Sequence, residues 1–311
     1  MSQAIGGQAV LEGVMMRGPR NWAVAVRTPD GQIALVAKEI QPLMARHWTL
    51  RLPVVRGVVA LGESLSIGFK ALAVSANYAA AEEAEGEATG NHELEEPAEI
   101  GRATLFFSFA VAIGFALMLF KVSPALLADL LPISNGGWFV LVEGVIRVTL
   151  FIGYLGVLSL IPSLRRVFQY HAAEHKAINA YEAGEELTPA NVQRYSLIHP
   201  RCGTAFLLWV MVLSIFVYAL FGRPEWYWLI VTRITFLPII AGIAYELIRY
   251  AGKHSGNRVL MTLLAPGLWL QRLTTREPEL DQLEVSIRAL REVLDREGRG
   301  GPADTRVEVM A

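Results

Sequence analysis

Four long apolar segments constrain this chain most, because the hydrocarbon core of a bilayer needs about 20 apolar residues to be crossed by a helix. The segments are Thr104 to Phe120, Trp138 to Ile161, Thr204 to Phe221 and Trp226 to Ile248. Hydrophobic residues make up 53% of the chain and charged residues 18%, which is too apolar for an ordinary soluble domain. The sequence therefore predicts a mainly α, polytopic α-helical membrane protein with about four transmembrane helices.

The connection between the second and third segments, from Ser163 to Gly203, sets the expected orientation. It carries five basic residues, namely Arg165, Arg166, Lys176, Arg194 and Arg201. Basic loops stay on the cytoplasmic side, so this connection and both termini are expected in the cytosol. The N-terminus has no secretory signal pattern. A net charge of −1 gives no reason to expect a nucleic-acid partner. The expected partner is the lipid bilayer, and the expected location is a cytoplasmic membrane.

Residues 1–78 form the first expected unit. Ile5 to Pro19 is rich in glycine and predicts a shaped loop whose backbone approaches something closely. Trp22 to Ile40 alternates apolar and polar residues on both sides of a Pro-Asp-Gly turn, which predicts a small N-terminal β-hairpin. Val54 to Ser75 is apolar but interrupted by charges, and we expect an interfacial helix that lies on the membrane surface or packs on the spans.

An acidic low-complexity run at 79–101 predicts a disordered linker, because it is too poor in apolar residues to build a core. Residues 102–273 form the membrane domain, with a cytosolic His-bearing helix within 163–203. That helix is expected to continue the second span past Pro162 and to stop at Gly184. Val259 to Leu273 has a central Pro-Gly pair and predicts an interfacial hairpin.

Residues 274–311 hold a C-terminal amphipathic helix and a tail. Apolar residues recur at helical spacing, at Leu280, Leu283, Ile287, Leu290 and Leu294. Such a helix docks its apolar face on the body of the protein or on a second subunit. A homo-oligomer or a soluble protein partner bound through 279–295 is therefore expected as one alternative, and Gly298 to Ala311 is expected to be disordered.

The run FQYHAAEHKAINAYE, from Phe168 to Glu182, carries the clearest chemical pattern. On a helix, His171 and His175 lie one turn apart on the same side, with Glu174 beside them. This H-x-x-E-H order is the one that inverted zinc peptidases use to bind a metal. It predicts a divalent metal, with zinc favoured and manganese or iron as alternatives. Two core histidines that bond to neighbouring carbonyls are the non-metal interpretation.

A metal on two histidines needs at least one more protein ligand. His199, in the segment that re-enters the membrane, is the favoured third ligand. Glu182, Cys202 and Glu246 are weaker candidates. Glu182 lies about 10 Å along a straight helix from His175, which is too far for one shared ion.

A hydrolytic mechanism follows from this pattern. The metal would lower the pKa of a bound water and Glu174 would take its proton. Arg201 or Tyr170 is expected to stabilise the developing oxyanion. Glu12 and Arg17, in their glycine-rich setting, are expected to close over the site.

Three charged residues lie inside apolar segments, namely Glu143, Arg147 and Arg233. Charges in hydrocarbon are costly and are usually paired, so a structural ion-pair cluster is expected, with an anion-binding pocket as the alternative. If these charges were the working residues, the protein would be a small transporter. A non-enzymatic membrane scaffold that recruits a partner through its C-terminal helix is the other alternative to an enzyme.

Several of these segments together resemble the bacterial YqhQ family of uncharacterised membrane proteins. The resemblance rests on GGQAVLEGVMMRGP, FQYHAAEHKAINAYE, HPRCGTAF, the segment from Pro238 to Glu246 and QLEVSIRAL. It implies a polytopic protein of a bacterial inner membrane and a predicted metal-dependent enzyme, with the H-x-x-E-H and H-P-R-C segments as its functional core. Ala180 departs from the family, in which we expect a cysteine at that position in many relatives.

Overall fold

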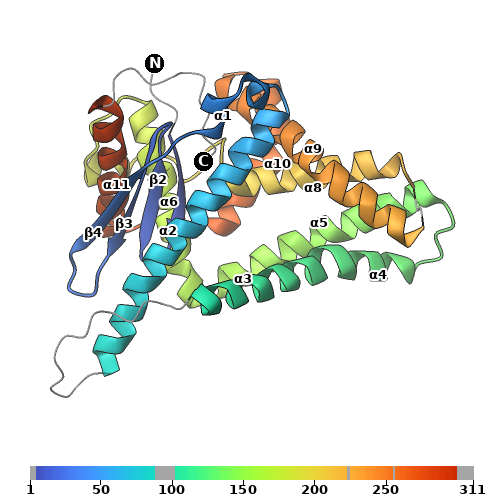
Figure 1. Cartoon of the computed structure of the whole chain (residues 1–311), viewed down its shortest axis with the longest axis horizontal. Coiled ribbons are helices and arrows are strands. Elements are labelled where there is room, and N and C mark those ends of the chain that lie inside the picture. The colour runs from blue at the N-terminus through green and yellow to red at the C-terminus, as the bar shows by residue number, and fades with distance from the viewer. Residues whose placement is uncertain (1–4, 88–101, 223–224, 255, 300–311) are drawn as a thin grey trace.

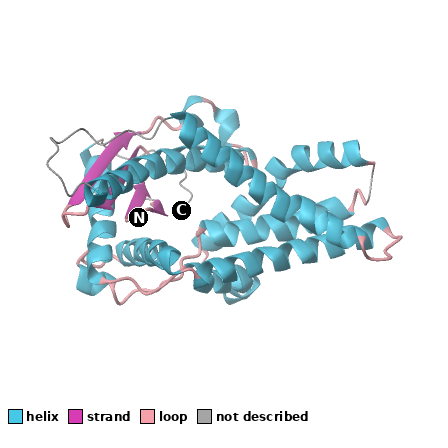
Figure 2. Ribbon diagram, turned by 90° about the horizontal axis from the view of Figure 1, so that it is seen from below, coloured by secondary structure: helices cyan, strands magenta, loops and turns pink. Residues whose placement is uncertain are grey.

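The computed structural model describes residues 5–87, 102–222, 225–254 and 256–299. A small sheet lies at one end of the molecule and a long helical body extends from it (Figures 1 and 2). The α-helices are α1 (Leu43–Arg46), α2 (Val55–Glu87), α3 (Arg102–Leu117), α4 (Ser123–Asp129), α5 (Gly136–Leu160), α6 (Pro162–Glu182), α7 (Pro189–Val192), α8 (Gly203–Ala219), α9 (Trp226–Lys253), α10 (Arg258–Thr274) and α11 (Leu280–Arg299). The mainly helical fold class is confirmed.

The described N-terminal residues form a four-stranded antiparallel sheet in the order β1-β2-β3-β4. The predicted hairpin is confirmed as β3 (Asn21–Arg27) and β4 (Ile33–Glu39). The loop predicted for Ile5 to Pro19 is wrong, because this segment forms β1 (Gly6–Val10) and β2 (Gly13–Arg17). Strand β2 is buried along its whole length, so its sequence lacks the alternation of apolar and polar residues that is typical of a half-exposed strand.

Helices cover both faces of the sheet, since alternate residues of each strand point to opposite sides. One face packs on α2 through residues that include Met15, Val24, Ile67 and Ala71. The other face packs on α6 and α11 through residues that include Val14, Ala25, Ile178 and Leu290. Figure 1 shows α2 and α11 flanking the strands. This arrangement places the His-bearing helix directly against the N-terminal sheet.

Helix α2 is 33 residues long and joins the two halves of the molecule. Its first half packs on α9, where Gly57 approaches the ring of Tyr245, and its second half packs on the sheet. The predicted linker began at residue 79, but α2 continues to Glu87, as its alanine- and glutamate-rich sequence favours. Residues 88–101 and the tail 300–311 lie outside the described residues.

Four helices of the described chain are long and apolar enough to cross a membrane. They span Val55–Tyr78, Phe107–Asp129, Gly136–Leu160 and Val231–Lys253. Three correspond to predicted spans, while the first is the helix that we expected on the membrane surface or packed on the other spans. The predicted span at Thr204 to Phe221 is the shorter apolar helix Gly203–Ala219. The chain is thus a multi-pass membrane protein.

A break at Ile161 separates the second predicted span from the His-bearing helix. Ile161 is extended (φ −78°, ψ 118°) and Pro162 begins α6, so the expected continuous helix is wrong here. A residue before proline avoids the helical region, which explains the break. Helix α6 turns away from α5 toward the sheet (Figure 1) and ends before Gly184, which has φ +74°, as predicted.

Helix α10 replaces the hairpin predicted at Val259 to Leu273. The Pro-Gly pair stays within one helix because packing holds it there: a Cβ on Gly267 would lie 3.2 Å from Ala205 Cβ in α8. Close approach of two helices requires a residue without a side chain at that point. Helix α10 thereby becomes a support for the start of α8.

The buried charges of the membrane body form the predicted ion-pair cluster. Glu143 accepts hydrogen bonds from Arg147 and from both terminal nitrogens of Arg233, the latter at 2.7 and 2.5 Å. Arg147 also donates to Ser214 Oγ at 3.3 Å. One carboxylate shared by two guanidinium groups ties α5 to α9 inside the membrane body.

Candidate metal centre

The candidate centre begins on α6, where the spacing of His171 and His175 places both rings on one helix face. The ring centroids lie 4.5 Å apart. Glu174, three residues after His171, shares that face and is almost fully buried. The expected H-x-x-E-H geometry is therefore present on a regular helix.

Backbone carbonyl groups orient both rings. His171 Nδ1 donates to the carbonyl oxygen of Thr274 at 2.8 Å, and His175 Nδ1 donates to that of Leu197 at 2.6 Å. A carbonyl oxygen only accepts, so each Nδ1 carries a proton, and Nε2 is the nitrogen left to bind a metal. Histidines that bind metals through Nε2 are held in this way.

Cys202 completes the group at the start of α8. Its sulfur lies 3.4 Å from His171 Nε2, and the ligand atoms of His171, His175 and Cys202 all lie within 4.8 Å of one another. Around one zinc ion, bond lengths of 2.0–2.3 Å imply ligand separations of roughly 3.3–3.8 Å. The 3.4 Å separation of Cys202 Sγ and His171 Nε2 falls in this range, so the three residues are a possible group of ligands for one metal ion.

A side chain from α10 fastens the turn that presents Cys202. Gln271 Nε2 donates to the carbonyl oxygen of His199 at 2.8 Å, and the backbone N–H of His199 donates to Gln271 Oε1 at 2.9 Å. This pair of hydrogen bonds fixes the H-P-R-C turn relative to α10. Because Thr274 of the same helix orients His171, α10 positions two of the three candidate ligands.

The electrostatics of the group reflect its burial. Burial raises the pKa of the Cys202 thiol, but the adjacent His175 and His171 together lower it well below its ordinary value. Burial lowers the pKa of His171, while Cys202 and Glu174 raise it more, to about 9. Burial also raises the pKa of Glu174. The protein without metal thus favours a thiolate beside a protonated imidazole.

Glu174 is packed against strand β1. A Cβ atom on Gly7 would lie 2.7 Å from Glu174 Cγ, which is closer than real Cβ contacts come. Only glycine fits at this contact, and the close backbone approach expected from the glycine-rich segment is present here. The sheet therefore forms one wall beside the carboxylate.

His199, the favoured third ligand, lies apart from this group. Its ring centroid is 5.9 Å from that of His175, and Nε2 is 3.7 Å from Glu182 Oε2, too long for a hydrogen bond. Within the described chain, neither ring nitrogen has a hydrogen-bond partner. Burial lowers the pKa of His199, so the ring is neutral at pH 7.

Other predicted site residues form ion pairs or hydrogen bonds among themselves. Arg201 donates to Glu182 and, at 3.4 Å, to the carbonyl oxygen of Ile5. Tyr170 OH donates to Glu12 Oε2 at 3.5 Å, and burial raises the pKa of the phenol.

Glu12 and Glu246, two further predicted site residues, each have an arginine partner. Glu12 accepts from Arg166 Nε at 2.7 Å, and Glu246 accepts from Arg56 Nε at 2.6 Å. The structure does not bring these two carboxylates to the three candidate ligands.

A cavity of about 480 Å³ borders the centre. His171, Glu174, His175 and Cys202 all line it. Arg17 also lines it, with its charge paired to Glu63 at 2.6 Å. Three predicted site residues lie outside α6 and the H-P-R-C turn, namely Glu12, Arg17 and Glu246. Of these three, Arg17 lines the cavity, and Glu12 and Glu246 do not. A reactant bound here would touch the candidate ligands and Glu174 together.

The comparisons with known proteins match this chain along most of its length. A family described as a protein of unknown function (DUF1385) matches residues 52–296. The chain belongs to the DUF1385 family. Over 298 residues it is 36% identical to the uncharacterized protein YqhQ of Bacillus subtilis (strain 168), which covers 94% of this chain and 92% of that protein. No solved structure matches the chain. The family resemblance inferred from the sequence is confirmed.

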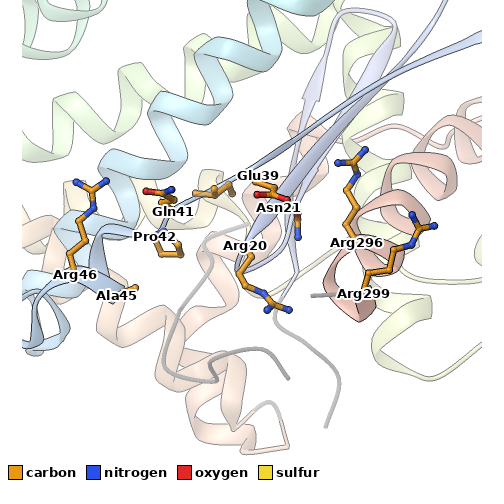
Figure 3. A pocket seen from close by; sticks show the side chains of 10 residues that line it. Arg20, Asn21, Glu39, Gln41, Pro42, Ala45, Arg46, Arg296 and Arg299 are labelled. Atoms are coloured by element: carbon orange, nitrogen blue, oxygen red, sulfur yellow. The ribbon is translucent and has the colours of Figure 1, made fainter. Parts of the chain in front are cut away.

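A larger depression, of about 760 Å³, lies elsewhere, between the end of β4, α1 and the end of α11. Figure 3 shows four arginines around it, namely Arg20, Arg46, Arg296 and Arg299. Two of these are engaged by carboxylates, since Arg20 binds Glu297 and Arg296 binds Glu292. None of the candidate metal ligands lines this depression.

Sequence reasoning missed the residues that position the ligands. Gln271 is a polar residue within an apolar segment, and that contrast was an available signal for a buried hydrogen-bonding role. The sequence gives no sign that the carbonyl oxygens of Thr274 and Leu197 orient the histidines, because every residue has a backbone carbonyl group. These positions are defined only by the packing of α10 and of the segment after α7.

Proposed function

We propose that this DUF1385 protein is a metal-dependent hydrolase of the membrane, with His171, His175 and Cys202 as metal ligands. The observation that carries the proposal is their joint position, with Glu174, on one wall of a cavity. Catalytic zinc sites use three protein ligands, whereas structural sites use four. A group of two histidines and one thiolate matches the former.

The donor atoms favour zinc. Thiolate and imidazole together suit zinc, whereas magnesium, calcium and manganese prefer oxygen ligands. When bound, the ion would supply a Lewis acid and an acidified water. His171 and His175 present Nε2 to it because their Nδ1 protons are held by carbonyl oxygens.

Glu174 is the proposed general base. It lines the same cavity as the ligands, and burial raises the pKa of its carboxyl, which favours accepting a proton. The backbone of β1 at Gly7 limits the space open to its side chain. A carboxylate held in this way takes a proton from water and returns it to the leaving group.

The proposal places the centre at the cytosolic face. The basic residues within α6 and after it favour a cytosolic position for this connection by the positive-inside rule, and both termini would then be cytosolic too. A cysteine introduced at exposed Glu186 would react with an impermeant maleimide only in opened cells. Reaction in intact cells would reverse the orientation.

The experiment that tests the function compares Glu174→Gln with the wild type. Both purified proteins are loaded with zinc and assayed on a panel of chromogenic p-nitrophenyl acyl esters. Loss of a general base lowers turnover by about 100-fold or more, while zinc stays bound. Glu186→Gln, an exposed carboxylate just after α6, is the matched control and keeps full activity.

Two results would count against this assignment. Equal turnover in Glu174→Gln and the wild type would remove the base from the mechanism. Loss of zinc together with activity in Glu174→Gln would make Glu174 a part of the metal group instead.

A further inference from the structure

The cavity beside the candidate centre is lined by both polar and apolar side chains. Polar groups in its lining include the ligand group, Glu174 and Arg17, with Gln8, Ser64 and Thr204. The large apolar side chains of the lining come mostly from α2, α5, α6 and α8, namely Leu61, Leu65, Leu155, Val167, Phe168, Phe206 and Leu207. A soluble polar substrate would leave these apolar walls in contact with water, at a cost of about 25 cal/mol per Å².

Two apolar residues of the cavity lining are also exposed at the surface of apolar helices. Leu65 is 52% exposed and Leu207 is 46% exposed, and both line the cavity. Leu65 lies within the apolar span Val55–Tyr78, and Leu207 lies within the apolar helix α8. Exposed leucines on such helices contact acyl chains in a bilayer. An acyl chain bound in the cavity would pass these leucines on its way to the hydrocarbon of the membrane.

Arg17 is a further polar residue in the cavity lining, besides the metal group and Glu174. Arg17 is only 1% exposed, and its Nε has no hydrogen-bond partner among the described residues, although Glu63 and Ser64 bind its terminal nitrogens. The guanidinium of Arg17, paired with Glu63, therefore adds a second polar group to the cavity lining. The arrangement suits a polar head group whose chain extends toward the bilayer.

We infer that the substrate is a membrane amphiphile with an acyl chain. Its chain occupies the apolar part of the cavity, and its hydrolysable head lies beside Glu174 and the metal group. This inference rests on the proposed function. A volume of about 480 Å³ is in the usual range for small-ligand pockets.

Photo-crosslinking in reconstituted vesicles tests the inference. The full-length protein is reconstituted with a phosphatidylcholine that carries a diazirine on one acyl chain, and labelled peptides are identified after illumination. We expect label on cavity residues of α5 and α8, such as Leu155 and Phe206. Zinc content is measured on the same samples.

Variants with larger side chains at the two exposed lining leucines are compared with the wild type. Leu207→Trp and, independently, Leu65→Trp exclude about two methylenes from the cavity, which costs about 1.6 kcal/mol and lowers cavity labelling by more than about tenfold. Leu220→Trp, at an 85% exposed position at the end of α8, is the matched control and keeps the label. All three variants keep their zinc.

The outcomes separate the two proposals. Zinc-loaded protein labelled only on its outer surface, equally in every variant, would contradict the amphiphile inference and favour a peptide substrate. Protein that binds no zinc would contradict the proposed function, and cavity labelling would then mark a lipid-binding site without hydrolysis.

Discussion

The sulfur of Cys202 lies 3.4 Å from Nε2 of His171, although 31 positions separate the two residues in the chain. Two structural features create this proximity. Helix α6 begins anew at Pro162 and turns toward the sheet, and Gln271 fastens the turn that precedes α8. The candidate centre thus lies where the sheet domain meets the membrane helices.

Replacing Cys202 by serine will abolish tight zinc binding. Changes to groups that merely support a zinc ligand already cost 10- to 100-fold in affinity, so loss of the thiolate costs more than about 100-fold. Zinc affinity is measured by competition with a chromogenic chelator. His199→Ala is the matched control: its ring belongs to the same turn but lies outside the ligand group, and this variant keeps wild-type affinity. The reverse pattern would make His199 the third ligand.

The affinity for zinc will rise with pH. With a pKa of about 9 in the protein without metal, His171 is protonated at pH 7. A proton on Nε2 competes with the ion, so binding releases this proton and the dissociation constant falls up to about tenfold per pH unit between pH 7 and 9. Calorimetry in buffers of different ionisation enthalpy counts the protons. A dissociation constant independent of pH over this range would exclude a protonated ligand.

The periodic parts of the fold were predictable from the sequence. The spacing of His171 and His175 on one face, the hairpin from Trp22 to Ile40 and the amphipathic C-terminal helix each depend on a local pattern. Leu283 and Leu290 are fully buried against the rest of the chain, so α11 uses its apolar face internally. A local periodic pattern in the sequence predicts both a helix or strand and the face of it that is buried.

Tertiary contacts account for what the sequence could not predict. His199 and Cys202 belong to one turn, and the sequence favoured His199 as the third ligand. Hydrogen bonds to Gln271, which is 72 positions away from His199, decide which of them faces the two histidines. Strand β2 was missed for a related reason, because burial on both faces removed its alternation.

Replacing Glu143 by glutamine will destabilise the membrane body. Arg147 and Arg233 would lose the carboxylate that both bind, and breaking a buried ion pair on one side costs about 3–5 kcal/mol. Unfolding by sodium dodecyl sulfate in mixed micelles measures this change. Asp295→Asn, at an exposed position on α11, is the control and shifts stability by less than about 0.5 kcal/mol. Unchanged stability with lost activity would assign the charges to a ligand pocket.

The metal content of detergent-purified protein tests the central claim most directly. Mass spectrometry of bound metals compares the wild type with His171→Ala and His175→Ala, and circular dichroism verifies that each variant is folded. We expect about one zinc ion per wild-type chain and none in either folded variant. A wild-type chain that binds no metal, even after reconstitution with zinc, would contradict the metal centre and leave two packed histidines in its place.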